Sequence, residues 1–183
     1  MLLRCAITTL AQDLTFKQIS LNEVKTTMAK KLMLALLFLT SFSCMSQKEA
    51  KRWLGYTDVD KLSDKFDWFR KGYDAYTSNF AYVEKLTLEL PAYTFLVFGG
   101  VWCSDTQKLL PQFYKIIDET GNPRNRVKLY LLDEKKISPE KLELQYKITR
   151  IPVFILLKDG KEVGRITEKT EISIEADLMK LIK

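Results

Sequence analysis

The sequence contains no histidine. Without an imidazole, the chain has no Ser-His-Asp or Cys-His catalytic arrangement and no histidine-ligated metal site. Its three cysteines, Cys5, Cys44 and Cys103, are too far apart in sequence to form a Cys-x-x-Cys pair. A zinc site built from cysteine alone needs four ligands. We therefore expect no metal and no cofactor, and any thiol chemistry must depend on one cysteine at a time.

The sequence also lacks a run of basic residues interleaved with aromatic ones. Lysine and arginine number 29 against 23 acidic residues, which gives a formal charge of +6, and half of that excess falls in residues 1–44. A mildly basic solvated surface accounts for this balance, so we predict no nucleic-acid partner. A length of 183 residues with 46% hydrophobic content suits one globular domain.

The apolar run over residues 32–42 is too short to cross a bilayer, because it has eleven residues where about 20 are needed. Lys30 and Lys31 precede it and small residues follow it, a pattern typical of an export signal. We predict a signal peptide over residues 28–47. Residues 1–27 show no export pattern, so we expect them to be a mis-assigned upstream extension, with Met28 as the initiator.

Two processing outcomes compete at the end of this segment. Residues 41–44 resemble a bacterial lipoprotein box, in which Cys44 would become the lipidated first residue of the mature chain, although such a box usually has leucine at the place of Ser41. Otherwise a signal peptidase cuts near Ser46 and releases a soluble product, or the segment stays as an uncleaved anchor. All three outcomes place the domain in the periplasm or cell envelope.

The remainder, residues 48–183, is predicted as one domain that begins with helices. Aromatic residues recur at spacings of three and four, which predicts an amphipathic helix from Phe66 to Tyr76. A second helix is expected from about Asn79 to Leu88, and Pro91 would stop it.

Short apolar runs after Pro91 predict four strands, over residues 94–98, 127–132, 153–157 and 162–166. Helices are expected between the first two strands, from Pro139 to about Tyr146, and over residues 174–182. The helical connection makes the first two strands parallel. Asp159-Gly160 predicts an antiparallel hairpin between the last two.

This order resembles the thioredoxin family, and particular stretches carry the resemblance. Residues 95–103, ending in Trp-Cys, are similar to the family's first central strand and active-site turn, and residues 148–160 are similar to its cis-proline segment and hairpin. The resemblance covers about residues 90–183, most securely from residue 93, and leaves residues 48–89 as a divergent part. It implies an α/β, thioredoxin-like fold of three layers, α/β/α, around a mixed sheet of four to five strands.

Three departures from the family pattern accompany the resemblance. Thr106 stands where the family has its second, resolving cysteine, and Val97 stands where it has a buried acid. Arg150 replaces a glycine two residues before the proline. The chain thus looks like the Trp-Cys-x-Asp subset of bacterial thioredoxin-like proteins, in a monothiol form.

The resemblance places Cys103 at the start of a helix, where unpaired N–H groups and the helix dipole lower the pKa of a thiol from about 8.5. Thr106 would donate its hydroxyl to the thiolate, whereas the carboxylate of Asp105 would oppose the negative charge. We expect Cys103 and Thr106 to be the catalytic pair, with Ser104, Asp105 and Arg150 as modulators.

The resemblance also assigns substrate-binding roles to Trp102, Ile151 and Pro152. A cis Pro152 would place the backbone of Ile151 beside Cys103, ready to pair with an extended substrate, and Trp102 would cover one edge. Two functions stay open. One is monothiol exchange with protein thiols or disulfides of the envelope, completed by an external thiol reductant. The other is a non-catalytic binding module. Membrane contact is expected only through a lipid on Cys44.

Overall fold

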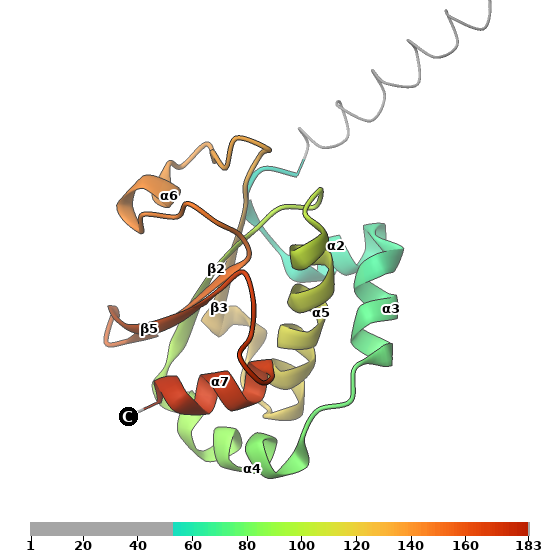
Figure 1. Ribbon diagram of the computed structural model, residues 1–183, viewed down its shortest axis with the longest axis vertical. Coiled ribbons are helices and arrows are strands. Elements are labelled where there is room, and N and C mark those ends of the chain that lie inside the picture. Colours follow the sequence, from blue (N-terminus) through green and yellow to red (C-terminus); the bar gives the residue numbers. More distant parts are fainter. Residues whose placement is uncertain (1–52, 183) are drawn as a thin grey trace, which may run out of the picture. The chain divides into compact units, whose positions relative to one another are not determined.

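Five strands and six helices form within residues 53–182, the part of the chain that the computed structural model describes (Figure 1). The strands are β1 (Gly55–Thr57), β2 (Thr94–Gly99), β3 (Val127–Leu131), β4 (Val153–Lys158) and β5 (Lys161–Thr167). The helices are α2 (Val59–Lys65), α3 (Asp67–Ala75), α4 (Phe80–Glu89), α5 (Ser104–Glu119), α6 (Leu142–Gln145) and α7 (Ile174–Leu181). The predicted extension, the signal peptide and Cys44 lie outside the described residues.

The strands pair in the order β1-β3-β2-β4-β5 to form one mixed sheet. β2 and β3 are parallel, as their helical connection through α5 predicts, and the other three pairs are antiparallel. Asp159 and Gly160, with φ of 52° and 74°, make the tight turn between β4 and β5. The predicted thioredoxin fold with a mixed sheet is therefore confirmed, and the sheet has five strands.

Successive side chains of β2 point to opposite faces of the sheet and enter different cores. Phe95 and Val97 belong to the larger core, which α2, α3, α4, α5 and α7 cover. Leu96 and Phe98 belong to a smaller core, against which Leu142 of α6 packs. Figure 1 shows α6 on the opposite side of the strands from α3 and α5. One face of the sheet is thus covered by long helices and the other by a single short one.

Most predicted elements are confirmed to within a few residues, from α3 and α4 through the hairpin to α7. Sequence patterns did not predict β1 or α2. The predicted start of α6 at Pro139 is wrong, because the helix begins at Leu142, after a left-handed residue, Lys141, with φ of 54°. Within residues 53–182, no helix combines the length and apolar character that spanning a membrane requires.

Candidate functional site

Cys103 lies where β2 turns into α5, and it is the N-cap residue of that helix. The chain leaves the sheet at Gly99, and the backbone N–H of Cys103 donates to the carbonyl oxygen of Gly100 at 3.0 Å, which closes the turn. The side chain is half-buried and carries a free thiol. The predicted position of Cys103, at the start of a 16-residue helix, is therefore what the structure has.

The loop before β4 brings a second segment to the thiol. The peptide bond between Ile151 and Pro152 is cis. The Sγ of Cys103 donates a weak hydrogen bond to the carbonyl oxygen of Ile151, with 3.8 Å between sulfur and oxygen. The backbone N–H of Glu168, just past β5, donates to the carbonyl oxygen of Pro152 at 2.7 Å. The thiol thus faces a backbone segment that the neighbouring strand holds in place.

Thr106 is the third residue of α5, in its first turn, and is fully buried. Its Oγ1 accepts a hydrogen bond from the backbone N–H of Gly100 at 3.2 Å. Its methyl group packs so closely on Gly99 that a Cβ there would lie 2.8 Å from Thr106 Cγ2. This hydroxyl is therefore bonded to the turn that carries Cys103, and its predicted donation to the thiolate stays a prediction.

The side chains of Trp102 and Gln107 also hold this turn in place. The indole Nε1 of Trp102 donates to the carbonyl oxygen of Leu132 at 3.0 Å, and the residue stays 37% exposed. The amide Nε2 of Gln107 donates to the carbonyl oxygen of Val101 at 2.7 Å. A Cβ on Gly100 would lie 2.7 Å from the indole nitrogen, so only glycine leaves room for this arrangement. These bonds fix the backbone on either side of the thiol.

The predicted modulators occupy different surroundings. Ser104 and Asp105 are the first two residues of α5, and Asp105 contributes a negative charge to its first turn. The Nη1 of Arg150 pairs with Oε2 of Glu168 at 3.2 Å, and the arginine side chain is 68% exposed. Val97, at the position of the family's buried acid, is completely enclosed in the larger core.

Sequence reasoning missed two residues that hold the site. Gln107 anchors the turn through Val101, and Glu168 reaches both the cis-proline loop and Arg150. Neither residue belongs to a recognisable motif, because each acts through a contact with a segment that only folding brings near. Within the described part of the chain, no group of three or more Cys, Asp or Glu side chains is arranged to hold a metal ion.

Comparison with known proteins identifies the family of this arrangement. The thioredoxin family model matches residues 83–182, which include β2, the Cys103 turn, the cis-proline loop and the closing helix. A search of curated proteins finds no match.

Solved structures resemble the chain at low identity. A protein of unknown function from Pseudomonas aeruginosa is 16% identical, with a TM-score of 0.47, over 69% of this chain and 80% of its own. Thioredoxin from Fasciola hepatica is 21% identical, with a TM-score of 0.35, over 53% and 84%. Oxidised mitochondrial thioredoxin 3 from Saccharomyces cerevisiae is 23% identical, with a TM-score of 0.36, over 61% and 96%. Because the family match extends over more than half of its length, the chain belongs to the thioredoxin family.

Proposed function

We propose that the protein carries out thiol–disulfide exchange through a single cysteine, Cys103. One arrangement carries the proposal: Cys103 is the N-cap residue of α5, with its Sγ 3.8 Å from the carbonyl oxygen of Ile151, and Thr106 lies in the first turn of that helix. Membership of the thioredoxin family supports redox chemistry of thiols and disulfides. Threonine cannot form a disulfide, which supports a reaction with one protein sulfur.

The proposed reaction proceeds in two exchanges. The thiolate of Cys103 attacks one sulfur of a protein disulfide, a new S–S bond forms, and the other substrate sulfur leaves as a thiolate that takes a proton from water. An external thiol then gives up its proton and attacks the substrate sulfur of this mixed disulfide, which restores the Cys103 thiolate. The substrate ends with the external thiol in place of its former partner, and the exchange involves no net oxidation.

The surroundings of the thiol support both exchanges. The N-cap side chain makes no hydrogen bond to the N–H groups of the first turn of α5, so a thiolate there would be an anion beside unpaired donors. We propose that an extended substrate segment pairs with the backbone of Ile151 and that Trp102 flanks it. Cys103 is only half-buried, so the residue is partly accessible to such a segment.

Trapping with glutathione disulfide tests the proposal. We expect the full chain to form a glutathione adduct at Cys103 that persists until a thiol is added, because no second cysteine lies among the described residues to resolve it. Peptide mapping separates Cys103 from Cys5 and Cys44, and Cys103→Ser is the matched control. An unmodified Cys103, or an adduct lost without added thiol, contradicts single-cysteine exchange.

A non-catalytic binding module is the second candidate. The buried Thr106, bonded to Gly100 and packed on Gly99, favours it because position 106 serves the packing of the turn. Capture from an envelope extract by the wild type and by Cys103→Ser separates the two functions. A partner held equally by both proteins supports binding alone, and a partner held only by the wild type through a reducible bond supports exchange.

We also propose that the protein is exported, as a periplasmic or envelope protein whose partners are envelope thiols and disulfides. The sequence pattern of residues 28–47 is what supports this proposal. The intact mass of the protein recovered from the envelope distinguishes a lipid on Cys44 from simple cleavage. Recovery of an uncleaved chain from the cytoplasm contradicts export.

A further inference from the structure

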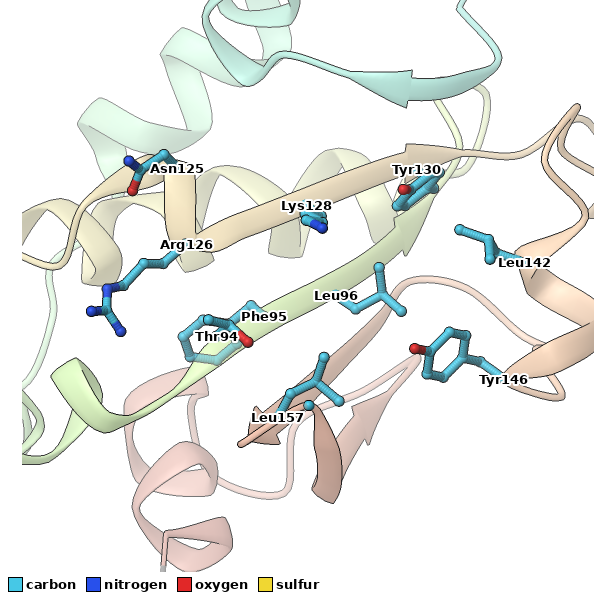
Figure 2. A pocket seen from close by; sticks show the side chains of 11 residues that line it. Thr94, Phe95, Leu96, Asn125, Arg126, Lys128, Tyr130, Leu142, Tyr146 and Leu157 are labelled. Atoms are coloured by element: carbon cyan, nitrogen blue, oxygen red, sulfur yellow. The ribbon is translucent and has the colours of Figure 1, made fainter.

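A groove of about 340 Å³ lies on the sheet face that carries α6. Figure 2 shows leucine side chains from β2 and β4 across from side chains of β3, with the α6 region at one end. Its lining includes Leu96, Lys128, Tyr130, Leu142, Tyr146 and Leu157. Its volume falls within the range of about 300–1,000 Å³ that is usual for small-molecule sites. Cys103 does not line the groove, so the groove is separate from the proposed thiol site.

The charge of the groove is entirely positive. Lys128 and Arg126 line it, and no aspartate or glutamate does. The Nη1 of Arg126 donates to the carbonyl oxygens of Pro91 at 2.6 Å and Tyr93 at 3.4 Å, which are neutral partners that do not compensate its charge. Across residues 53–182, neither cation forms an ion pair with a carboxylate. Arg126 lies at one end of the groove and Lys128 lies midway along it, between Arg126 and Tyr130 (Figure 2). Two cations without a carboxylate partner in this half of the groove favour a ligand with a negative group.

The end of the groove near α6 is mostly apolar. Leu142 and Tyr146 are only partly buried against the smaller core, so carbon surface faces the groove there, beside the Tyr146 hydroxyl (Figure 2). Leu157 pairs with Thr94 on the neighbouring strand and adds apolar surface nearer to Arg126. Burial raises the pKa of Tyr130, and the negative charge of Glu140 raises it further. The hydroxyl of Tyr130 therefore stays neutral at physiological pH. The acidic Glu140 near Tyr130 would repel an anion there. A ligand would therefore point its negative group toward Lys128 and its apolar part toward Tyr146.

We propose that this groove binds a small amphiphilic carboxylate, with the carboxylate at Lys128 and Arg126 and the apolar body along Leu96 and Leu157 toward Tyr146. The two cations favour a ligand with a negative group, and the leucine surface favours an anion with an apolar chain over a small anion such as acetate. The site does not depend on Cys103, so loss of thiol exchange leaves the binding intact.

Titration of the full chain with monomeric decanoate, followed by amide chemical shifts, tests the proposal. We expect saturable shifts confined to β2, β3, β4 and the α6 region. Acetate lacks the apolar body and decanol lacks the charge, so each should bind more weakly. Lys128→Glu should raise the Kd for decanoate by about five- to tenfold, because it turns an attraction into a repulsion at a partly exposed site. Lys85→Glu, at an exposed position on α4, makes the same change in net charge and should leave the Kd unchanged.

Several outcomes would overturn this site. One is the absence of saturable binding, and another is an equal Kd for the wild type and Lys128→Glu. Equal affinities for decanol and decanoate would show that Lys128 and Arg126 do not contribute to binding. A dimer that forms through this face and blocks decanoate would make a second copy the occupant. Cys103→Ser should bind decanoate as the wild type does, which separates this result from the outcome of the exchange assay.

Discussion

Thr106 connects the first turn of α5 to the backbone that carries the thiol. Its Oγ1 is the acceptor for the N–H of Gly100. Because the residue is fully buried, no water replaces that acceptor if the hydroxyl is removed. At this position the chain therefore has a structural hydrogen bond where a dithiol enzyme has a second sulfur.

Replacing Thr106 with valine tests this bond. Thr106→Val keeps the shape but leaves the buried N–H of Gly100 without an acceptor, so we expect a loss of about 1–3 kcal/mol in the free energy of unfolding. Thr106→Ser retains the hydroxyl and should lose only the contribution of one methyl group, about 1 kcal/mol. Urea denaturation measures both variants. A Thr106→Val protein as stable as the wild type would show that the bond contributes nothing.

Replacing Thr106 with cysteine tests whether the second sulfur is all that dithiol chemistry lacks. We expect Thr106→Cys to reduce insulin disulfides where the wild type does not turn over, because Cys103 and the introduced cysteine would then resolve mixed disulfides internally. Thr106→Ser is the control with no added sulfur. If Thr106→Cys gains no reductase activity, then Val97, Arg150 or the shape of the site also prevents turnover.

At the residue scale, motifs predicted the positions of Cys103 and of the Ile151–Pro152 loop beside it. They did so because the Trp-Cys pair follows one recognisable strand and the Ile-Pro pair directly precedes another. Gln107 and Glu168 were not predictable in this way. Each bonds to a backbone group on another turn or strand, and a linear sequence does not show which groups approach one another.

At the scale of elements, Asp118 links α3 and α5 to the turn that precedes β3. Its carboxylate accepts hydrogen bonds from Tyr73 at 2.7 Å and from Nη2 of Arg124 at 2.6 Å. Burial opposes its charge, but these hydrogen bonds outweigh burial and hold the pKa of Asp118 below its usual 3.8. Burial, with the Asp118 carboxylate, raises the pKa of Tyr73 to about 12, so the tyrosine remains a donor at neutral pH.

This cluster predicts a pH dependence of stability. The pKa of Asp118 is lower in the folded state than in the unfolded state, so its ionised carboxylate stabilises the fold at pH values above the unfolded pKa of about 4. This stabilisation disappears as the pH falls through the folded-state pKa. Asp118→Asn should therefore cost about 1–2 kcal/mol at pH 7, and its deficit should shrink by pH 3. Urea denaturation at the two pH values measures this.

Asp67→Asn is the matched control for Asp118→Asn. It breaks the exposed pair with Arg70, whose side chains are 76% and 64% accessible, and should cost about 0.5 kcal/mol or less. A deficit for Asp118→Asn that is absent at pH 7, or that is the same at both pH values, would contradict the role of the ionised carboxylate.

The elements that the sequence did not predict are the short ones. β1 has three residues, too few for an alternating pattern, and it exists through its pairing with β3 and the bond from its Tyr56 N–H to Glu140. α6 starts later than predicted because Ser138 donates to the buried carboxylate of Glu143, which keeps the chain before Leu142 in turns. Long-range contacts therefore determine β1, and a local side-chain hydrogen bond determines where α6 begins.

At the scale of the whole domain, the two faces of the sheet differ in how much they are covered. Neighbouring residues on β4 show the difference, since Leu156 is fully buried under the long helices and Leu157 lines the groove on the other face. We expect Leu156→Ala to cost about 2–5 kcal/mol and Leu157→Ala less than half as much. Chemical denaturation of the two variants measures this, and equal costs would mean that the groove face is as tightly packed as the core.

We propose above all that the fold makes Cys103 a reactive thiol. Its reaction rate with a small aromatic disulfide, in the folded chain and in the urea-unfolded chain at one pH, tests this claim most directly, with peptide mapping to assign each cysteine. Burial alone would slow the reaction of the folded thiol, whereas its place at the start of α5 and its partial accessibility favour attack on a disulfide. We predict faster reaction of Cys103 in the folded chain. An equal or slower rate in the folded chain would contradict the account.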